Sequence, residues 1–353
     1  METSEKIAAL TRVLPDWYAA HARALPWRED REPFHVWLSE VMLQQTRVEA
    51  VKGYYARFLA AVPDLPALAN ADPELLHKLW EGLGYYSRVR NLQKAAQVVL
   101  SDHGGVFPRS LQAVRALPGI GDYTAGAICS ICYDLPTPAV DGNVLRVVTR
   151  LTGDERCVDD PAVRRDLSAK LAAVYPRQGA GTLTQALMEL GATVCVPNGA
   201  PKCEQCPAAD FCTAREAGSW ERLPVRAGKR ARREERLTVF VLSCDGALAL
   251  RKRKASGLLA GLWEFPNVPG WLEAQQALDL CAQWGLRPRG VEKQIERTHI
   301  FTHIQWQMRC FYLSCATQAE GFFWADENAL DGQYALPTAF RMFRPGNSSI
   351  LTP

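Results

Sequence analysis

The hydrophobic pattern of this 353-residue chain changes once, at a basic segment over residues 219–235. Before it, apolar residues recur three and four positions apart, which is the period of amphipathic helices. After it, runs such as LTVFVLS, ALALRKR, HIQWQMRCFYLS and GFFWA have the period of strands, with a helical stretch WLEAQQALDLCAQWG between them. The length allows two hydrophobic cores. We therefore predict a helical domain over residues 1–218, a linker over 219–235 and an α+β domain over 236–353.

Composition narrows the class of protein. The chain is 48% hydrophobic and 22% charged, as in soluble globular proteins. It has neither a secretory amino end nor an apolar run of about 18 residues, so we expect no membrane span. We also expect a monomer. A bacterial cytoplasm, close to the nucleoid, is the expected location, with a nucleus as the alternative. The net charge is +3, but the stretch from Arg222 to Arg236 holds seven Lys or Arg and two Glu. This linker either faces phosphates or is merely solvated.

Four cysteines lie within the 18 residues of CVPNGAPKCEQCPAADFC, separated by seven, two and five residues. They are Cys195, Cys203, Cys206 and Cys212. Because no secretory signal precedes them, a disulfide framework is disfavoured. Zinc sites more often use two C-x-x-C pairs set further apart, whereas a compact run with unequal gaps suits a [4Fe-4S] cluster. We predict the iron-sulfur cluster, with zinc as the alternative.

A glycine-rich loop stands at the centre of RALPGIGDYTAGAI. One helix is predicted to end near Leu117 and the next to begin near Asp122, with Gly119 and Gly121 between them. Glycines let backbone N–H groups approach a phosphate oxygen, and the amino end of the second helix favours negative charge. This is the pattern of a helix-hairpin-helix, here over about 111–130, which binds the DNA backbone without reading sequence. A plain tight turn is the alternative.

Two carboxylates have contrasting predicted surroundings. Glu40 lies in FHVWLSEVMLQQTRVEAV, which we predict to be one largely buried helix, so desolvation should raise the pKa of Glu40. Asp141 stands where a helix should begin in TPAVDGNVLRVVTRL, and free backbone N–H groups there should favour its charge. A protonated carboxyl beside an ionised one can break a glycosidic bond. A tolerated helix Glu and an ordinary N-cap Asp are the alternatives.

Together these residues resemble the adenine DNA glycosylases of the MutY family, within the endonuclease III-like superfamily. The resemblance covers nearly the whole chain: LPWR, SEVMLQQTRV, WEGLGYYSRVRNL, LPGIGDYTAGAI, VDGNVLRV, TQALMELGA, the four cysteines and GLWEFP. It implies a mainly α, two-lobed helix-hairpin-helix glycosylase with a [4Fe-4S] cluster, followed by a Nudix-like α+β domain. The family removes adenine mispaired with 8-oxoguanine from double-stranded DNA, and A:G mispairs are the related substrate. The family's first cysteine gap is usually six residues, and here it is seven.

The resemblance also implies roles for single residues. Glu40 would protonate the adenine near N7, and Asp141 would stabilise or transiently capture the sugar cation before water attacks. Because the adenine is extruded from the duplex, it needs a pocket. Positions that match the adenine pocket are Trp27, Arg28, Leu43, Gln185 and Met188, while Gln45 and Tyr85 match residues that fill or wedge the duplex near the lesion.

The carboxyl-terminal domain resembles the part of the family that recognises 8-oxoguanine. The family's usual Phe-Ser-His loop corresponds here to Phe301, Thr302 and His303, in which Thr302 keeps the hydroxyl and adds a methyl group. A strand-edge segment without a ligand contact is the alternative. The segment after GLWEFP lacks the acidic Nudix helix, so no pyrophosphatase activity is predicted.

Two other functions compete with adenine removal. An endonuclease III-type enzyme with lyase activity would form a Schiff base through a lysine after the glycine loop, whereas this chain has Tyr123 at that position. A non-catalytic lesion-binding protein would use the same cleft, but both carboxylates are present. We therefore predict a monofunctional adenine DNA glycosylase.

Overall fold

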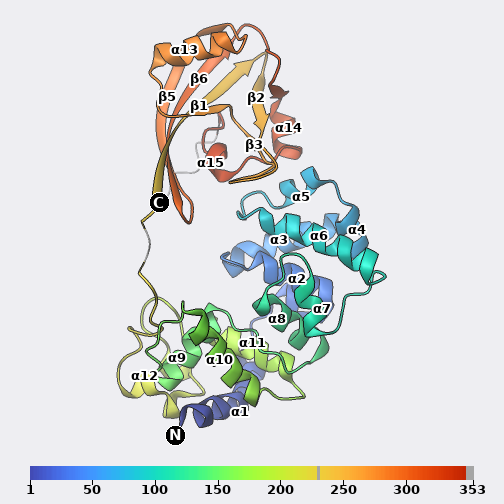
Figure 1. The fold of residues 1–353 in the computed structure, drawn as a ribbon, viewed down its shortest axis with the longest axis vertical. Helices are drawn as coiled ribbons and strands as arrows, with labels where there is room; N and C mark the ends of the chain where they lie inside the picture. The colour runs from blue at the N-terminus through green and yellow to red at the C-terminus, as the bar shows by residue number, and fades with distance from the viewer. Residues whose placement is uncertain (229–230, 347–353) are drawn as a thin grey trace. The chain divides into compact units, whose positions relative to one another are not determined.

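The computed structural model describes residues 1–228 and 231–346 (Figure 1). The chain divides into two compact units. The first comprises Met1–Asn70 and Asn91–Gly228, and the second comprises Ala71–Arg90 and the residues after Gly228. The predicted domain boundaries at residues 218 and 236 stay a prediction. No helix within the described ranges is long and apolar enough to cross a membrane.

The first unit is helical, as the 3.6-residue period predicted. Its helices, with the short helices of the cysteine loop, are α1 (Thr3–His21), η1 (Pro26–Arg28), α2 (Pro33–Met42), α3 (Val48–Ala61), α4 (Leu65–Asn70), most of α6 (Ser87–Asp102), α7 (Leu111–Ala116), α8 (Asp122–Tyr133), α9 (Gly142–Thr152), α10 (Pro161–Val174), α11 (Ala180–Thr193), η2 (Cys203–Gln205), η3 (Ala209–Phe211) and α12 (Thr213–Glu216).

These helices form two lobes. In one lobe α1 packs against α9, α10 and α11 around a core that includes Leu10, Leu14, Val148, Leu167 and Leu187. In the other lobe α2 packs against α3 and α8, and α7 packs against α8. The helix α8 also contacts α11 of the first lobe, where Gly181 lies against the backbone of Ser130 and Ile131. This close approach joins the two lobes where α8 and α11 meet.

The second unit is an α+β domain, also as predicted. The described strands are β1 (Arg233–Cys244), β2 (Ala247–Lys252), β3 (Trp263–Glu264), β4 (Asn267–Pro269), β5 (Pro288–Ile300), β6 (Ile304–Cys315) and β7 (Phe323–Ala325), and the helices are α5 (Pro73–Leu79), α13 (Ala274–Gln283), α14 (Glu327–Gly332) and α15 (Thr338–Arg341).

The sheet of this unit has the order β3-β2-β1-β6-β5, with β4 paired to β1 and β7 paired to β2. The central strands β1 and β6 run parallel, and the β5–β6 hairpin is antiparallel. One face packs on α13 through Phe240, Phe311 and Ala277, and the other packs on α14 and α15. The segment Ala71–Arg90 belongs to this unit through Glu74, which accepts a hydrogen bond from Trp263 Nε1 at 2.9 Å and pairs with Lys252.

One local expectation is wrong, and one strand was not predicted. The stretch 34–51 is not one helix: α2 ends at Met42, a turn follows, and α3 begins at Val48. Gln45 has a φ of 57°, in the left-handed region, which ends the helix although the sequence has neither Gly nor Pro there. The strand β5 was not predicted, because RPRGVEKQIERTHI is mostly polar and the strand lies at the exposed edge of the sheet.

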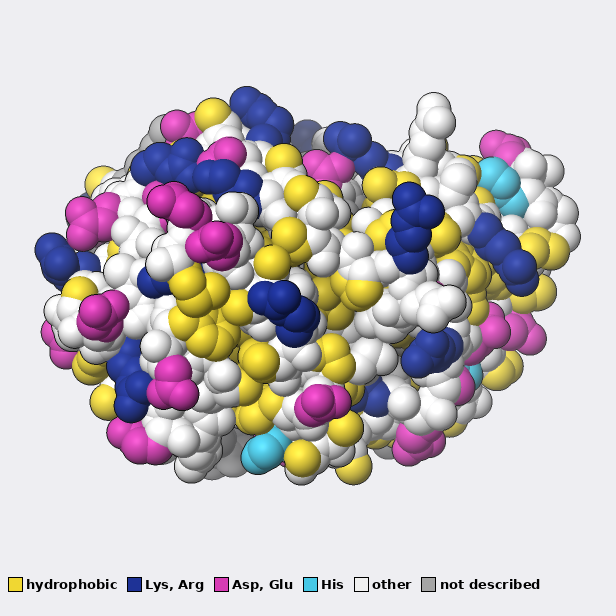
Figure 2. Space-filling model, turned by 90° about the horizontal axis from the view of Figure 1, so that it is seen from below, with side chains coloured by type: hydrophobic (Ala, Val, Ile, Leu, Met, Phe, Trp, Pro, Cys, Tyr) yellow, Lys and Arg dark blue, Asp and Glu magenta, His cyan; other side chains and the backbone are white. Residues whose placement is uncertain are grey.

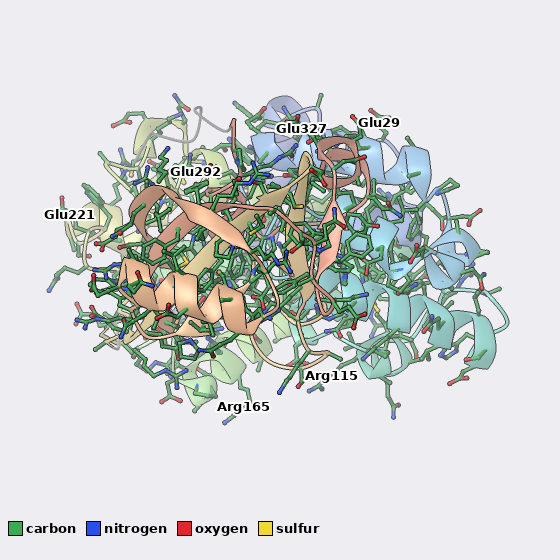
Figure 3. The ribbon with its side chains drawn as sticks, turned by 90° about the horizontal axis from the view of Figure 1, so that it is seen from above. Glu29, Arg115, Arg165, Glu221, Glu292 and Glu327 are labelled. Carbon is green, nitrogen blue, oxygen red and sulfur yellow. The ribbon has the colours of Figure 1, made fainter. Side chains whose placement is uncertain are left out.

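On the face shown in Figure 2, Lys and Arg side chains and Asp and Glu side chains are mixed among apolar ones, in keeping with the small net charge. Arg115, Arg165 and Glu221 are exposed and extend outward from the ribbon (Figure 3). Any anionic partner must therefore be held by local groupings of cations.

Candidate active site

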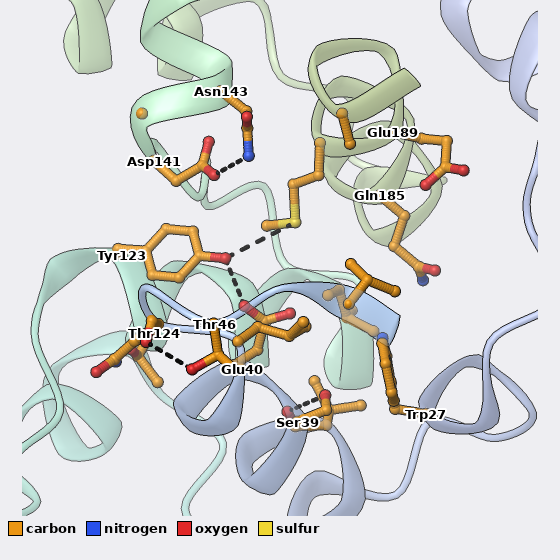
Figure 4. A pocket seen from close by; sticks show the side chains of 18 of the residues that line it. Trp27, Ser39, Glu40, Thr46, Tyr123, Thr124, Asp141, Asn143, Gln185 and Glu189 are labelled. Atoms are coloured by element: carbon orange, nitrogen blue, oxygen red, sulfur yellow. Dashed lines mark hydrogen bonds between the residues drawn. The ribbon is translucent and has the colours of Figure 1, made fainter. Parts of the chain in front are cut away.

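A cavity of about 740 Å³ opens in the first unit between the two lobes. It is lined by η1, α2, the turn between α2 and α3, the loop between α7 and α8, and the amino end of α9 and one side of α11 (Figure 4). The structure brings eleven of the predicted site residues to this one cavity: Trp27, Arg28, Glu40, Leu43, Gln45, Gly119, Gly121, Tyr123, Asp141, Gln185 and Met188.

Glu40 lies in the last turns of α2 and is only 6% exposed. Burial raises the pKa of its carboxyl to about 7, with a smaller raising effect from the charge of Asp141. The hydroxyl of Tyr123 donates a hydrogen bond of 2.5 Å to Glu40 Oε2, which acts in the opposite direction and lowers that pKa. Glu40 is therefore a carboxyl that can hold a proton near neutral pH and is positioned by one donor.

Tyr123 is the second residue of α8 and lines the cavity. Its hydroxyl stands 2.5 Å from Glu40 and 3.9 Å from Met188 Sδ. Burial, with the nearby charges of Glu40 and Asp141, raises its pKa well above the ordinary value. Tyr123 is therefore a neutral hydrogen-bond donor at physiological pH.

Asp141 is the N-cap of α9, as predicted. Its Oδ1 accepts from the backbone N–H of Val144 at 2.7 Å. Its Oδ2 accepts from Asn143 Nδ2 at 2.7 Å (Figure 4). The expected net effect on its charge is wrong, because desolvation is the largest influence and raises the pKa of Asp141 despite these bonds. The cap contacts and the charge of Arg146 lower that pKa and offset part of the cost of burial.

Arg146 orients Asn143, which donates to the N-cap residue Asp141. Arg146 Nη2 donates to Asn143 Oδ1 at 2.8 Å and to the carbonyl of Gly191 at 2.7 Å, while its Nε donates to the carbonyl of Cys195 at 2.8 Å. Asn143 thus has a fixed amide orientation, with its carbonyl toward Arg146 and its NH₂ toward Asp141. These bonds join the capping carboxylate to the start of the cysteine loop.

The opposite wall of the cavity is shaped by aromatic, amide and guanidinium groups. Trp27 packs edge-on against Tyr55 and is nearly fully buried. The hydroxyl of Tyr18 donates to Gln185 Oε1 at 2.8 Å, so the NH₂ group of Gln185 is left to face the cavity. A planar base bound here would meet apolar faces and a small number of directed polar groups.

A buried carboxylate, Glu189, anchors this wall. It is 0% exposed, and Arg23 and Arg28 both pair with it, with Arg28 Nη2 at 2.7 Å from Oε2. These pairs and hydrogen bonds lower the pKa of Glu189 against the opposing effect of burial. The guanidinium of Arg28 also lies over the ring of Tyr18. Arg28 is therefore held in one orientation at the cavity wall.

The glycine loop connects α7, which ends at Ala116, with α8, which begins at Asp122, close to the predicted Leu117 and Asp122. Gly119 has a φ of 76°, and a Cβ there would lie 2.5 Å from Asn91 Cβ. Gly121 is the N-cap of α8 with a φ of −96° and has open space where a Cβ would be. Arg115 and Asp122 pair across the turn at 2.7 Å. Gly119 is thus required by the fold, whereas Gly121 leaves the backbone accessible from outside.

A second pocket, of about 530 Å³, lies in the second unit and takes the other predicted DNA-contacting residues. Phe301, Thr302 and His303 form the tight connection between β5 and β6, and the ring of Phe301 packs on Trp306. Tyr85, which is 46% exposed with a φ of 47°, lies within 2.9 Å of Thr302 Oγ1 through its hydroxyl.

The four cysteines line a third, small cavity of about 30 Å³ beside α9. Within residues 1–228 and 231–346, no group of three or more His, Cys, Asp or Glu side chains stands in the arrangement of a formed metal site. The donor set still fits an iron-sulfur cluster, because four thiols from one loop surround one space. Arg150 Nη1 lies 3.4 Å from Cys195 Sγ and supplies an N–H group of the kind that stabilises cluster sulfurs.

Several residues of the cavity were not predicted. Tyr18, Arg23, Asn143, Arg164 and Glu189 line it or orient the residues that do. The sequence could have indicated Glu189, since it lies four positions after Gln185 and therefore on the same face of α11. The sequence could not have indicated Tyr18 and Arg23, because their partners are more than 160 positions away along the chain.

Known proteins are similar to this chain in sequence and in fold. Residues 38–173 match the HhH-GPD superfamily of base excision DNA repair proteins, and residues 238–344 match the NUDIX domain. A thermostable thymine-DNA glycosylase superposes with a TM-score of 0.55 at 26% identity, over 61% of this chain and 99% of that chain.

Two mammalian relatives extend the similarity along the chain. The adenine DNA glycosylase of Rattus norvegicus is 35% identical over 370 residues, covering 88% of this chain and 72% of the relative. That of Homo sapiens is 35% identical over 89% of this chain and 68% of the relative. With a helix-hairpin-helix unit, a Nudix-like unit and identity of this extent, the chain belongs to the adenine DNA glycosylase family, the MutY family of base excision repair enzymes.

Proposed function

We propose that this enzyme hydrolyses the N-glycosidic bond of adenine mispaired with 8-oxoguanine or guanine in double-stranded DNA, without efficient strand cleavage. The observation that supports this most directly is the pair of carboxyls in one cavity. Glu40 has a pKa near 7 and accepts a hydrogen bond from Tyr123, and Asp141 caps the amino end of α9. An acid and an anion on two sides of one cavity suit an oxocarbenium-like transition state.

In the proposed mechanism the extruded adenosine enters the cavity between Trp27 and Met188. Glu40 donates its proton to adenine N7, so that the N9–C1′ bond breaks with its electron pair leaving on the neutral base. Asp141 stabilises the positive charge that develops on the sugar or bonds briefly to C1′. Water then attacks C1′ and transfers a proton to the Glu40 carboxylate, which restores the acid and completes the abasic site.

Strand cleavage of the lyase type is disfavoured by Tyr123. A lyase requires an amine to form a Schiff base with C1′, and a phenol bonded to Glu40 has none. The second pocket is proposed to read the opposite base through Phe301, Thr302 and His303, with Gln45 and Tyr85 entering the duplex beside the lesion.

The four cysteines are proposed to hold a [4Fe-4S] cluster, which when bound supplies iron-thiolate bonds that cross-link the loop at 195–212. Purified protein should then be yellow-brown, with broad absorption near about 400 nm. A colourless preparation containing zinc would exclude this assignment, and Cys212→Ser should diminish the absorption.

The function is tested by single-turnover assays on three duplexes, with adenine opposite 8-oxoguanine, adenine opposite guanine, and thymine glycol opposite adenine. We expect base release from the first two only, lost in Asp141→Asn. Asp160→Asn is the matched control, because Asp160 caps α10 in the same way, accepting from Ala162 N at 2.8 Å, but does not line the cavity. Activity confined to thymine glycol contradicts the proposal, as does binding of all duplexes with no release. Borohydride trapping separately reports lyase chemistry.

A further inference from the structure

Residues 225–227 of the basic linker are hydrogen-bonded to the lobe that contains α9 and α10. Val158 N donates to the carbonyl of Val225 at 2.9 Å, and Ala227 N donates to Asp159 Oδ2 at 3.0 Å. Val158 itself is buried. The segment 225–227 is therefore held beside the loop between α9 and α10, which distinguishes it from a merely solvated linker.

This docking places Arg226 next to the cavity. Its Nη1 lies 3.5 Å from Asp159 Oδ1, and its Nη2 lies 3.5 Å from the position that a Cβ on Gly142 would occupy. Gly142 directly follows Asp141, begins α9 and lines the cavity. The side chain of Arg226 is 51% exposed, so its guanidinium lies between solvent and the amino end of α9.

A second arginine reaches the same place from α10. Arg164 lines the cavity, donates from Nε to the carbonyl of Val158 at 2.6 Å, and pairs with Asp159 Oδ1 at 3.2 Å. Its side chain is 49% exposed. Two guanidinium groups thus share the single carboxylate of Asp159, which leaves one net positive charge among these three side chains. A structural ion pair needs only one arginine, and half-exposed pairs add little stability.

We propose that Arg226 and Arg164 together bind the backbone phosphate that flanks the extruded adenosine. The proposal rests on the function proposed above, because it assumes that Asp141 faces C1′ of that nucleotide. The sugar bearing C1′ is linked directly to a phosphate on either side, so a cation beside Gly142 stands where one of these phosphates must pass. Guanidinium groups bind phosphate oxygens in pairs of parallel hydrogen bonds.

This phosphate site differs from the glycine loop. Gly119 and Gly121 offer backbone N–H groups at the α7–α8 turn, whereas Arg226 and Arg164 approach from the α9–α10 side of the cavity. With both in use, the DNA backbone is held at two points on either side of the flipped nucleotide, which orients its sugar toward Asp141. The linker thereby contributes to substrate binding as well as to the connection of the two units.

The test is a cycle that combines protein and DNA changes. The target adenosine is made resistant to cleavage by a 2′-fluorine, and the phosphate 5′ or 3′ to it is replaced by an uncharged methylphosphonate. We expect one of the two replacements to weaken wild-type binding about 10-fold, and Arg226→Gln to weaken binding of unmodified DNA by a similar factor. The combined loss should be much smaller than the product of the two, since both changes remove the same contact.

Three further measurements complete the test. Arg164→Gln should couple to the same phosphate, and Arg226→Lys should restore part of the affinity. Arg156→Gln is the control, because Arg156 is 48% exposed and ion-paired with Asp154 and Asp166 but neither lines the cavity nor lies beside Gly142. It should show no coupling to either phosphate. A thermal melt of each variant reports whether the fold is retained.

The possible failures are distinguishable. If wild-type enzyme releases adenine and the effects of Arg226→Gln multiply with those of both neutralised phosphates, the phosphate site is wrong while the proposed function stands. If Arg164→Gln couples to one flanking phosphate and Arg226→Gln to the other, the proposal that both arginines bind one phosphate is wrong. If wild-type enzyme releases no adenine from either mispair, the proposed function itself fails.

Discussion

Glu40 and Asp141 are both buried, yet their hydrogen-bond partners differ. Asp141 accepts from a backbone N–H group and from Asn143, whose amide is fixed by Arg146. Glu40 accepts from the hydroxyl of Tyr123. Because each donor favours the charged carboxylate, Asp141 has the greater support for ionisation. The two carboxyls interact and should titrate as a coupled pair, with the first proton lost mainly from Asp141.

Tyr123→Phe tests how the phenol tunes the acid. Removing its hydroxyl takes away a contact that lowers the pKa of Glu40, so that pKa should rise above its present value of about 7. Since Glu40 must be protonated to act, the alkaline limb of the single-turnover rate profile should move to higher pH. Tyr133→Phe in the same helix is the control, because that hydroxyl bonds to the carbonyl of Phe107. A limb that moves to lower pH would refute the assignment of Glu40 as the acid.

Glu40→Gln should make the protein more stable at alkaline pH. The folded-state pKa of Glu40 is raised, so between about pH 4.5 and 7 the native state binds more protons than the unfolded state. Stability is therefore lost as pH rises through this window, and a neutral amide avoids the loss. We expect a gain of about 1–3 kcal/mol at pH 8 and little gain at pH 4.5, measured by denaturant unfolding. An equal gain at both pH values would show that burial of the charge is not its cause.

Local breaks in regular structure supply much of the cavity. The turn between α2 and α3 brings Leu43 and Gln45 to its rim, and the α7–α8 loop brings Gly119 and Gly121. The second break was predicted, because glycines mark it in the sequence. The first was not, because the apolar period continues through 34–51 and a left-handed Gln45 has no reliable sequence signal.

The two glycines of the loop should respond differently to the same substitution. Gly119→Ala places a Cβ against Asn91 in a left-handed backbone, which should cost about 1–3 kcal/mol of stability. Gly121→Ala meets open space in an ordinary extended backbone, so its stability should change little. Its methyl group should instead hinder a phosphate oxygen and weaken DNA binding several-fold.

Thermal unfolding and titration with duplex DNA measure these two effects separately. The pair is its own control, because each variant adds one methyl group within the same turn. Equal loss of DNA affinity without loss of stability in both variants would contradict the structural role of Gly119. Unchanged DNA affinity in Gly121→Ala would favour a plain turn over a phosphate-binding loop.

Sequence patterns predicted the candidate site residues more completely than the contacts that orient those residues. Period and spacing predicted the two fold classes, the capping place of Asp141 and the clustered cysteines. They did not predict Glu189 as the anchor of Arg23 and Arg28, or Tyr18 as the partner of Gln185. These contacts join α1 and the η1 region to α11, and a local pattern does not encode pairings so distant in the chain.

Across the whole chain, the residues proposed for chemistry and those proposed for lesion reading belong to different units. Glu40 and Asp141 line the cavity of the first unit, together with the residues proposed to contact adenine. Phe301, Thr302 and Tyr85 line the pocket of the second unit. Substitutions in the second unit should therefore alter which duplex is bound and leave the bond-breaking step intact.

Thr302→Val tests this separation. Valine keeps the shape of threonine and removes the hydroxyl that lies 2.9 Å from that of Tyr85. Loss of one polar contact to the lesion should weaken binding of duplexes with adenine opposite 8-oxoguanine about 5- to 10-fold, and binding of the guanine counterpart much less. The single-turnover rate constant at saturating enzyme should not change, because Glu40 and Asp141 are untouched. Tyr85→Phe removes the partner hydroxyl and reports whether Thr302 acts through it. Equal weakening on both duplexes would assign Thr302 to general DNA binding, and a slower bond-breaking step would contradict the division of labour between the units.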